Sequence, residues 1–205
     1  MAHNAQAVFF KQVKKTFPEF FEWSNVLEVG SLNINGTVRD NFVNCNYVGV
    51  DLDIGPGVDL AVQGQALEFR DGAFDITTSA ECFEHNPFWR ETFLNMKRMT
   101  KTGGLIVFTC AGKDRPEHGT YRTDPGSSPF TTAALWTYYG NLEEKDFDEE
   151  LLKGLNYQFF YNPGSQDLYF VAEKVGWDCD GKEFNLIDEL PWNDIAAERF
   201  DEYVN

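Results

Sequence analysis

Two spacings of apolar residues alternate along the chain, and they predict helices and strands in turn. Val8, Phe9, Val13 and Phe17 fall on one face of a helix over 5–17, and Pro18 ends that pattern. Short apolar runs then appear, each bounded by polar residues or glycine, as is typical of buried strands. These runs cover 25–30, 47–51, 58–62, 74–79 and 105–110.

The stretches between these runs have the length of connecting helices, so consecutive strands should pair in parallel. The first two runs, for example, are about fifteen residues apart. The clearest helix precedes the last run: Asn86 can cap it, Pro87 suits its first position, and Gly103-Gly104 would end it. The side chains expected to face the sheet from this helix are Trp89, Phe93 and Met96.

The second half of the chain predicts a lid and a hairpin. Residues 113–130 form a Gly-, Pro-, Ser- and Thr-rich loop, long enough to be functional, and an acidic helical stretch follows at 142–155. The runs 157–161 and 167–172, joined by Asn-Pro-Gly-Ser-Gln, predict an antiparallel hairpin. The expected fold is α/β: a mostly parallel, seven-stranded, Rossmann-like sheet with an antiparallel C-terminal hairpin and helices on both faces.

Composition is that of one globular, acidic domain. The 205 residues carry 17 Lys and Arg against 33 Asp and Glu, a formal charge of −16, and 42% of them are hydrophobic. Such a chain can bury a sizeable core, which excludes intrinsic disorder as its general state. The charge repels phosphate backbones and anionic lipid, so we expect neither a nucleic acid nor a membrane as partner.

The cysteines and the N-terminus indicate the compartment. Cys45, Cys82, Cys110 and Cys179 lie far apart without metal-type spacing, which is typical of reduced thiols in the cytoplasm. The first residues lack a secretory signal pattern, and no apolar stretch approaches the length of a membrane span. We therefore expect a soluble cytoplasmic protein, and its oligomeric state stays open.

Candidate chemistry lies where the predicted parallel strands end, because such sheets bind ligands beyond the carboxyl ends of their strands. The first strand ends in Glu28-Val29-Gly30 and the second in Asp51, 21 residues after that glycine. An acid at the second position can accept hydrogen bonds from ribose hydroxyls. The intervening loop lacks the G-x-G-x-x-G pattern that binds a pyrophosphate, so the residues predict a nucleoside rather than a dinucleotide.

These motifs resemble those of the class I S-adenosylmethionine-dependent methyltransferases over 24–112. The family's first motif is similar to V-L-E-V-G at 26–30, its F-x-D-G-x-F-D motif to 69–75, and its K-P-G-G turn to K-T-G-G at 101–104. The resemblance implies the methyltransferase fold and S-adenosylmethionine as cofactor. The cofactor-binding residues that it implies are Glu28, Gly30 and Ser31, then Asp51 for the ribose, Leu52, Gln63 and Gly64 near the adenine, and Ser79.

The first loop departs from the family pattern. The family's E-x-G-x-G-x-G reads E-V-G-S-L-N-I-N-G here, so Leu32 and Asn33 stand where small residues are usual. Gln63 stands where an aspartate usually faces the adenine amine, and its carbonyl can accept the same hydrogen bond. The loop around Leu32 is therefore the segment for which the resemblance predicts least.

A second group of polar residues follows the fourth strand. Glu81, Glu84 and His85 would share one face of a helix, and His118 lies in the long loop after the fifth strand. The E-x-x-E-H run is similar to one that binds magnesium in ubiquinone-pathway O-methyltransferases and in small-RNA 2′-O-methyltransferases. This likeness implies all four residues as ligands of Mg²⁺ or Mn²⁺. Many methyltransferases without a metal also carry Glu-His here, with the histidine beside the substrate.

The same region offers residues for catalysis and substrate binding. His85 or His118 can act as general base, because imidazole titrates near neutral pH. Arg115 and Arg122 can hold a carboxylate or phosphate of the substrate, or can be ordinary solvated arginines. No Ser-His-Asp or Cys-His set is visible, which fits methyl transfer, since an activated sulfonium needs alignment more than covalent catalysis.

The sequence thus predicts an enzyme that methylates a small-molecule acceptor, most simply at an oxygen. The alternatives are a non-catalytic member that binds the cofactor, a metal-assisted 2′-O-methyltransferase acting on RNA, and a nicotinamide-dependent oxidoreductase. One domain, 1–205, should comprise an N-terminal helix at 1–23, a cofactor-binding core at 24–112, a loop and helical lid at 113–155, and a C-terminal hairpin and tail at 156–205.

Overall fold

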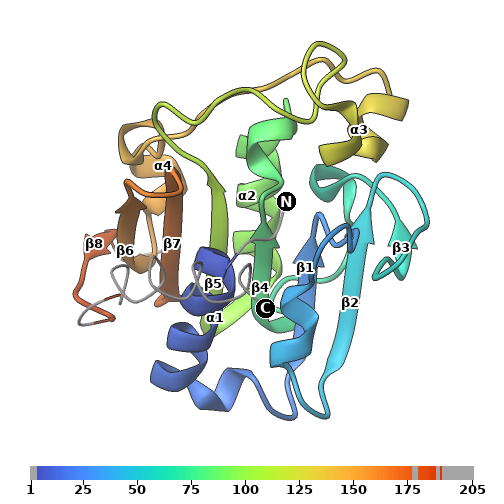
Figure 1. The fold of residues 1–205 in the computed structure, drawn as a ribbon. Helices are drawn as coiled ribbons and strands as arrows, with labels where there is room; N and C mark the ends of the chain where they lie inside the picture. Colours follow the sequence, from blue (N-terminus) through green and yellow to red (C-terminus); the bar gives the residue numbers. More distant parts are fainter. Residues whose placement is uncertain (1–3, 177–179, 188–189, 191–205) are drawn as a thin grey trace, which may run out of the picture.

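One mixed sheet organises the protein (Figure 1). The computed structural model describes residues 4–176, 180–187 and 190, and in that part of the chain the sheet has eight strands in the order β3-β2-β1-β4-β5-β7-β6-β8. The first five strands are parallel, and β7 is antiparallel to both β5 and β6. The strands are β1 (Asn25–Val29), β2 (Asn46–Asp51), β3 (Leu60–Ala61), β4 (Phe74–Ala80), β5 (Thr100–Ala111), β6 (Leu155–Asn162), β7 (Asp167–Lys174) and β8 (Lys182–Glu183).

The strand order reverses beside β1. The chain passes from β1 outward to β2 and β3, and then returns to place β4 on the other side of β1. Glu28 is therefore opposite Gly49 of β2 and Thr78 of β4. Ligands of open α/β sheets bind at such a reversal, beyond the carboxyl ends of the strands.

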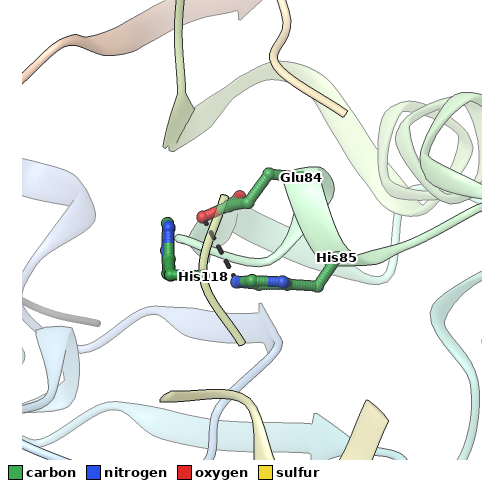
Figure 2. Close-up of side chains that lie close together, drawn as sticks. All are labelled: Glu84, His85 and His118. Atoms are coloured by element: carbon green, nitrogen blue, oxygen red, sulfur yellow. Dashed lines mark ion pairs between the residues drawn. The ribbon is translucent and has the colours of Figure 1, made fainter. Parts of the chain in front are cut away.

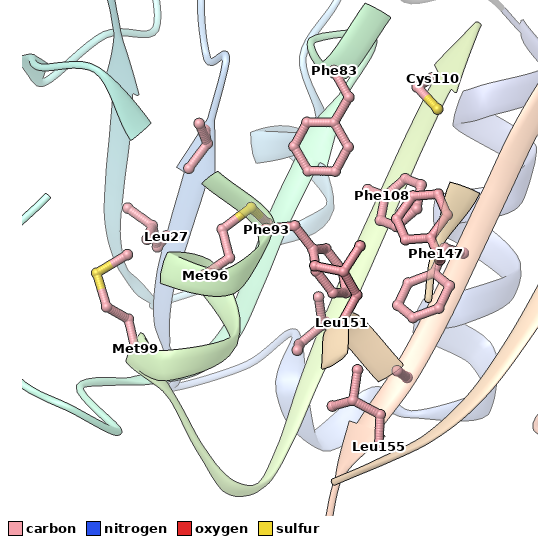
Figure 3. Close-up of a cluster of buried hydrophobic side chains, with 14 of the residues drawn as sticks. Leu27, Phe83, Phe93, Met96, Met99, Phe108, Cys110, Phe147, Leu151 and Leu155 are labelled. Atoms are coloured by element: carbon pink, nitrogen blue, oxygen red, sulfur yellow. The ribbon is translucent and has the colours of Figure 1, made fainter. Parts of the chain in front are cut away.

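One face of the sheet is covered by α2 (Trp89–Met99) and by the segment before β6 (Figure 3). Phe93 and Met96 of α2 are fully buried, as the sequence predicts, and Trp89 packs against the same cluster. Phe93 lies edge-on to Phe108 of β5 at a centroid distance of 5.9 Å. Phe108 stacks on Phe147, 5.3 Å away, which ties the segment before β6 to the sheet.

The other face is covered by α1 (Asn4–Thr16), the predicted opening helix. Phe9, Phe10 and Val13 are fully buried, and the Phe9 ring lies 5.0 Å from that of Tyr169 on β7. Side chains alternate between the two faces along each strand, so Val107 and Phe108 enter different cores. The expectation of helices on both faces is confirmed.

No α-helix connects β1 to β2, although the sequence left room for one. The described segment between them holds only the 3-10 helix η2 (Val38–Asn41). Asn33 explains part of this outcome, because its side-chain oxygen accepts a hydrogen bond from the Gly36 amide at 2.9 Å and so closes a local turn. Asn, Gly and β-branched residues, which favour helix poorly, make up most of the loop.

Several predicted boundaries also shift. Asn86 holds the chain before α2 by accepting from the Phe88 amide, but the helix itself begins at Trp89. Gly103 and Gly104 lie within β5, where the register shifts against β4, and do not end the helix. The acidic stretch at 142–155 forms only η6 (Glu144–Asp146) and the short α4 (Glu149–Leu152).

The predicted hairpin and part of the lid are present. β6 and β7 pair in register from Leu155 opposite Lys174 to Asn162 opposite Asp167. The long loop after β5 contains η5 (Pro125–Ser127) and α3 (Pro129–Ala133), and α3 lies above the carboxyl ends of β1 and β2 (Figure 1). The remaining short elements are η1 (Pro18–Phe20), η3 (Gly64–Ala66) and η4 (Phe83–His85).

Within the part of the chain that the structure describes, no helix combines the length and the apolar character needed to cross a bilayer. Cys45, Cys82 and Cys110 are free thiols there, as predicted. Cys179 lies outside the described residues, as does most of the predicted C-terminal tail.

Replacement of Phe93 by alanine should destabilise the protein by about 3–5 kcal/mol, because it removes a fully buried ring from the centre of the core under α2. Urea unfolding followed by circular dichroism measures this change. Phe184→Ala is the control, since that side chain is 45% exposed and its loss should cost less than about 1 kcal/mol. Equal costs for the two variants would contradict this account of the core.

Candidate functional site

A pocket of about 920 Å³, including open space at its mouth, lies at the strand reversal and is lined in part by α3. Its floor comes from the end of β1 and the loop after it, one wall from the end of β2 and from η3, and another from the end of β4 and from η4. The lid, which we define as 125–136, lies across it. The lid residues that line the pocket are Ser127, Ser128, Pro129, Phe130, Thr131 and Trp136.

Glu28 reaches the pocket from the end of β1 but is only 3% exposed. Its carboxylate accepts a hydrogen bond of 2.7 Å from the Tyr47 hydroxyl, and Arg39 lies over the Tyr47 ring. Burial raises the pKa of Glu28 to about 7, against the opposing effects of the Tyr47 hydrogen bond and the Arg39 charge. The group is thus poised to change its charge near neutral pH.

Asp51 ends β2 and closes the loop that follows β1. One carboxylate oxygen accepts from the Leu32 amide at 3.0 Å, and the other accepts from the Leu52 amide at 2.7 Å. Burial raises its pKa, and these two backbone hydrogen bonds lower it. Each oxygen retains a further lone pair toward the pocket, so Asp51 can accept from a ligand while it holds the loop.

Two glycines let the backbones meet at this point. Gly30 has φ +81°, and a Cβ built on it would lie 2.6 Å from the Cβ of Cys82, so a larger residue would collide with the segment after β4. A Cβ on Gly49 would lie 2.4 Å from the Gly57 carbonyl and 2.7 Å from Oγ of Ser31. The pocket floor therefore depends on close backbone packing between β1, β2 and their loops.

Only some of the other predicted cofactor-binding residues line the pocket. Ser31, Leu52 and Gly64 line the pocket together with Glu28, Gly30 and Asp51. Gln63 does not line it, and Gln65, two residues later, does. Ser79 is fully buried in β4, where its hydroxyl donates to the Val29 carbonyl at 2.8 Å. Ser79 thus supports the floor from below without facing the ligand.

A second set of titratable groups, defined here as the Glu84 cluster, consists of Glu84, His85 and His118 (Figure 2). One donor atom from each lies within 4.8 Å of the others. The nearest Glu84 oxygen is 3.8 Å from Nε2 of His85, and the two imidazole rings are 5.0 Å apart. Residues 33 positions apart in sequence thus converge, because η4 and the loop after β5 both begin at the same edge of the sheet.

Burial governs the charges of this cluster. It raises the pKa of Glu84 to about 8, and the nearby Glu81 carboxylate acts in the same direction. Burial also lowers the pKa of His85 to about 3 and, in the same direction, that of His118. In the metal-free protein near pH 7 the contact between Glu84 and His85 is therefore one between largely uncharged groups, not a full ion pair.

Most polar side-chain atoms of the Glu84 cluster have no hydrogen-bond partner among the described residues, so they can bind a ligand or a proton. Among the described residues, no other residue donates to the Glu84 carboxylate, and neither ring nitrogen of His85 has a partner. His118 is held only through Nδ1, which lies 3.1 Å from the Tyr139 hydroxyl. Glu81, with φ +53°, lines the pocket beside His85 and connects the cluster to it.

The two predicted substrate arginines point elsewhere. Arg115 is paired with buried Asp167 of β7 and also donates to the Ser165 carbonyl. Arg122 pairs with Glu117 and donates to the Thr137 carbonyl. Neither lines the pocket. The structure thus places both guanidinium groups in contacts within the chain and outside the pocket lining.

The sequence offers Trp136 and Tyr139 as aromatic walls of an acceptor pocket, but it gives no sign of the pocket residues at 127–131. It identified 113–130 as a functional loop but named no pocket residue in it beyond the arginines and His118. Trp136 lines the pocket and contacts the Phe88 ring at 5.8 Å, and the Tyr139 ring lies 5.5 Å from that of His85. No motif marks these positions, because their role depends on how the loop folds back over the sheet.

Fold and site together define a class of protein: a Rossmann-like sheet with a pocket at its strand reversal, lined by Glu28 and Asp51, which is the arrangement of the class I methyltransferases. A family model described as "Methyltransferase domain" matches residues 1–187. The chain belongs to this family and is an S-adenosylmethionine-dependent methyltransferase. None of the curated proteins matches it.

Solved structures agree on the fold. A Burkholderia thailandensis 1,6-didemethyltoxoflavin-N1-methyltransferase, solved with S-adenosylhomocysteine, is 14% identical with a TM-score of 0.57, over 83% of this chain and 79% of that one. The N-methyltransferase NodS of Bradyrhizobium japonicum, also with S-adenosylhomocysteine, is 14% identical with a TM-score of 0.54, over 83% and 87%. The YcgJ protein of Bacillus subtilis is 14% identical with a TM-score of 0.55, over 85% and 100%.

The raised pKa of Glu28 predicts a specific loss of stability with rising pH. The folded state keeps a proton on Glu28 between about pH 4.5 and pH 7 that the unfolded state has released, so raising the pH through this window costs stability. In wild type the free energy of unfolding should fall by about 3 kcal/mol over this window, since each tenfold change in proton affinity equals about 1.4 kcal/mol. Glu28→Gln has no proton to lose at this position and should not show this fall.

The measurement is urea unfolding at pH 5 and pH 8 for wild type, Glu28→Gln and the exposed control Glu91→Gln. The control should keep the wild-type pH dependence. A Glu28→Gln variant with that same dependence would show that Glu28 is not the titrating group.

Proposed function

We propose that this methyltransferase acts on an uncharged small molecule, with an oxygen as the methylated atom, and that Glu28 and Asp51 hold opposite ends of the cofactor. The observation that carries the proposal is the placement of these two acids at the tips of adjacent parallel strands, on either side of Gly30, in one pocket. Glu28 would receive the amino group of the methionine part and Asp51 the ribose hydroxyls.

The residues present fit S-adenosylmethionine. Leu52 supplies an apolar surface for the adenine ring, and Gly64 and Gln65 lie along the same wall. When bound, the cofactor supplies a methyl group already activated by its sulfonium charge. The protein then has to align an acceptor with that methyl group and exclude water, tasks for which proximity is worth up to roughly 7–11 kcal/mol.

The charge of the pocket supports an uncharged acceptor. None of the described residues lining it is a lysine or an arginine, and Glu28, Asp51 and Glu81 all contribute carboxyl groups. Arg115, a cation that interacts with Glu84, is already paired with Asp167. A phosphate or carboxylate on the acceptor would meet repulsion here, and the charge of −16 disfavours RNA in the same way.

His118 is the better of the two predicted bases when no metal is present. The buried imidazole of His85 lines the pocket, but a pKa of about 3 makes it a weak proton acceptor. His118 is less buried, lies beside His85 and is oriented by the Tyr139 hydroxyl. We propose that His85 positions the acceptor hydroxyl and that His118 receives its proton.

Binding of S-adenosylhomocysteine tests the cofactor site directly. Wild type should bind it in calorimetry, and Asp51→Asn should raise its Kd about 10- to 100-fold, because hydrogen bonds to a charged group contribute about 1.5–3 kcal/mol. Asp53→Asn, two residues later and exposed, is the control and should bind like wild type. Unchanged affinity in Asp51→Asn, or saturable binding of NADH instead, would contradict the proposal.

As a second candidate function, we propose that a divalent cation binds the Glu84 cluster, of which His85 lines the pocket. Two imidazoles and a buried carboxylate without a donor are a donor set that Zn²⁺, Mn²⁺ and related ions accept. Separations up to 4.8 Å exceed those between ligands bound at about 2.0–2.2 Å, so the side chains would have to move inward. Such an ion would supply Lewis-acid activation of an acceptor hydroxyl.

Metal binding can be measured without any acceptor. Titration of the protein with Mn²⁺, followed by electron paramagnetic resonance, should show one site, and His118→Ala should weaken it at least about tenfold because a direct ligand is lost. Asp114→Asn, an exposed acid on the same loop, is the control. Equal Mn²⁺ affinity in all three proteins would remove the metal and leave the histidines as proton-transfer residues.

A further inference from the structure

We infer that Leu32, Gly55 and Phe130 form a latch that holds the lid closed over the bound cofactor and so sets the rate at which the cofactor leaves. The inference rests on the proposed cofactor site, but the latch itself is a feature of the folded chain. It also gives a role to Leu32, one of the residues that departs from the family's glycine-rich loop.

The contact joins three segments that are distant in sequence. Leu32 belongs to the loop after β1, Gly55 to the turn after β2, and Phe130 to α3 of the lid. A Cβ built on Gly55 would lie 2.7 Å from Cδ1 of Leu32 and 2.9 Å from Cζ of Phe130. Both side-chain tips thus rest against the bare backbone of Gly55, and only glycine leaves room for them.

The latch lies across the cofactor end of the pocket. Leu32 and Phe130 both line the pocket, and the Leu32 amide donates to Asp51, the proposed ribose acceptor. The Asn33 amide donates to the Pro56 carbonyl at 2.8 Å, which fixes the first loop against the turn that contains Gly55. The lid therefore closes on two loops that are already joined to each other and to Asp51.

The helix α3 is weak on its own. α3 has only five residues, too few to be stable alone, and none of them is buried. Its hydroxyl hydrogen bonds, such as the one between Ser128 and Thr131 at 2.6 Å, are internal to the lid. The contact of Phe130 with Leu32 and Gly55 attaches α3 to the loops after β1 and β2, and its loss should free the lid.

Stopped-flow dissociation of S-adenosylhomocysteine tests the latch. We expect Phe130→Ala to release the ligand about tenfold faster, with a smaller change in the association rate, because opening the lid mainly affects departure. Gly55→Ala should have a similar effect, since the added methyl displaces two side-chain tips without straining the backbone. Phe130→Leu, which keeps an apolar side chain, should restore most of the slow release.

The double variant separates a latch from two unrelated defects. If Phe130 acts through Gly55, the Gly55→Ala/Phe130→Ala protein should release the ligand no faster than either single variant. Leu135→Ala is the control: this lid residue is 70% exposed and should dissociate the ligand like wild type. Additive effects in the double variant, or wild-type release from Phe130→Ala, would overturn the inference.

A measurement without ligand keeps the latch distinct from the proposed cofactor site. The Ala134 and Trp136 amides donate within the lid to the Phe130 and Thr131 carbonyls. Their hydrogen exchange in the free protein should quicken in Phe130→Ala and in Gly55→Ala, while that of the β-sheet stays unchanged. Faster exchange with no ligand binding would disprove the cofactor site alone. Unchanged exchange would disprove the latch.

Discussion

The cost of burying carboxyl groups is the constraint on which the site depends. Glu28 and Glu84 are removed from water almost completely, and burial raises the pKa of each to about 7 and about 8. Such groups are tolerated only when they hold a proton, accept strong hydrogen bonds or meet a cation. Glu28 lines the pocket, so a ligand that brings a positive charge to its carboxyl group is favoured, as we propose for the amino group of S-adenosylmethionine.

Because no helix follows β1, the loop at the pocket floor is held in another way than in many nucleotide-binding folds. Many nucleotide-binding folds bring the amides of a helix N-terminus to the ligand. Here the loop stays irregular, and Asp51 fixes it by accepting from the Leu32 amide. One carboxylate therefore shapes the floor of the pocket as well as facing the proposed ribose. This irregular loop has room for the bulky side chain of Leu32, which lies against Gly55 together with Phe130 of the lid.

Much of the cofactor site could be predicted from sequence, and less of its surroundings. Glu28, Gly30 and Asp51 follow short apolar strands, so their place at the carboxyl end of the sheet follows from chain direction alone. Gln65 lines the pocket and Gln63, two residues earlier, does not, a difference that the sequence does not show because this segment has no helical or strand periodicity. The partner of Arg115 could not be read from the sequence, because Asp167 lies 52 residues further along the chain.

The sequence by itself determined the layered α/β fold, the parallel pairing of its early strands, the closing hairpin and the position of Glu28 and Asp51 at the carboxyl end of the sheet. These depend on local apolar spacing, on turn residues and on the direction of each strand, which are written along the chain. The tertiary structure alone decided which residues of the long loop reach the pocket, how His118 comes to lie 5.0 Å from His85, and that Phe130 rests on Gly55. Those contacts join segments with no shared periodicity, and they exist only once the sheet brings its strand ends to one edge.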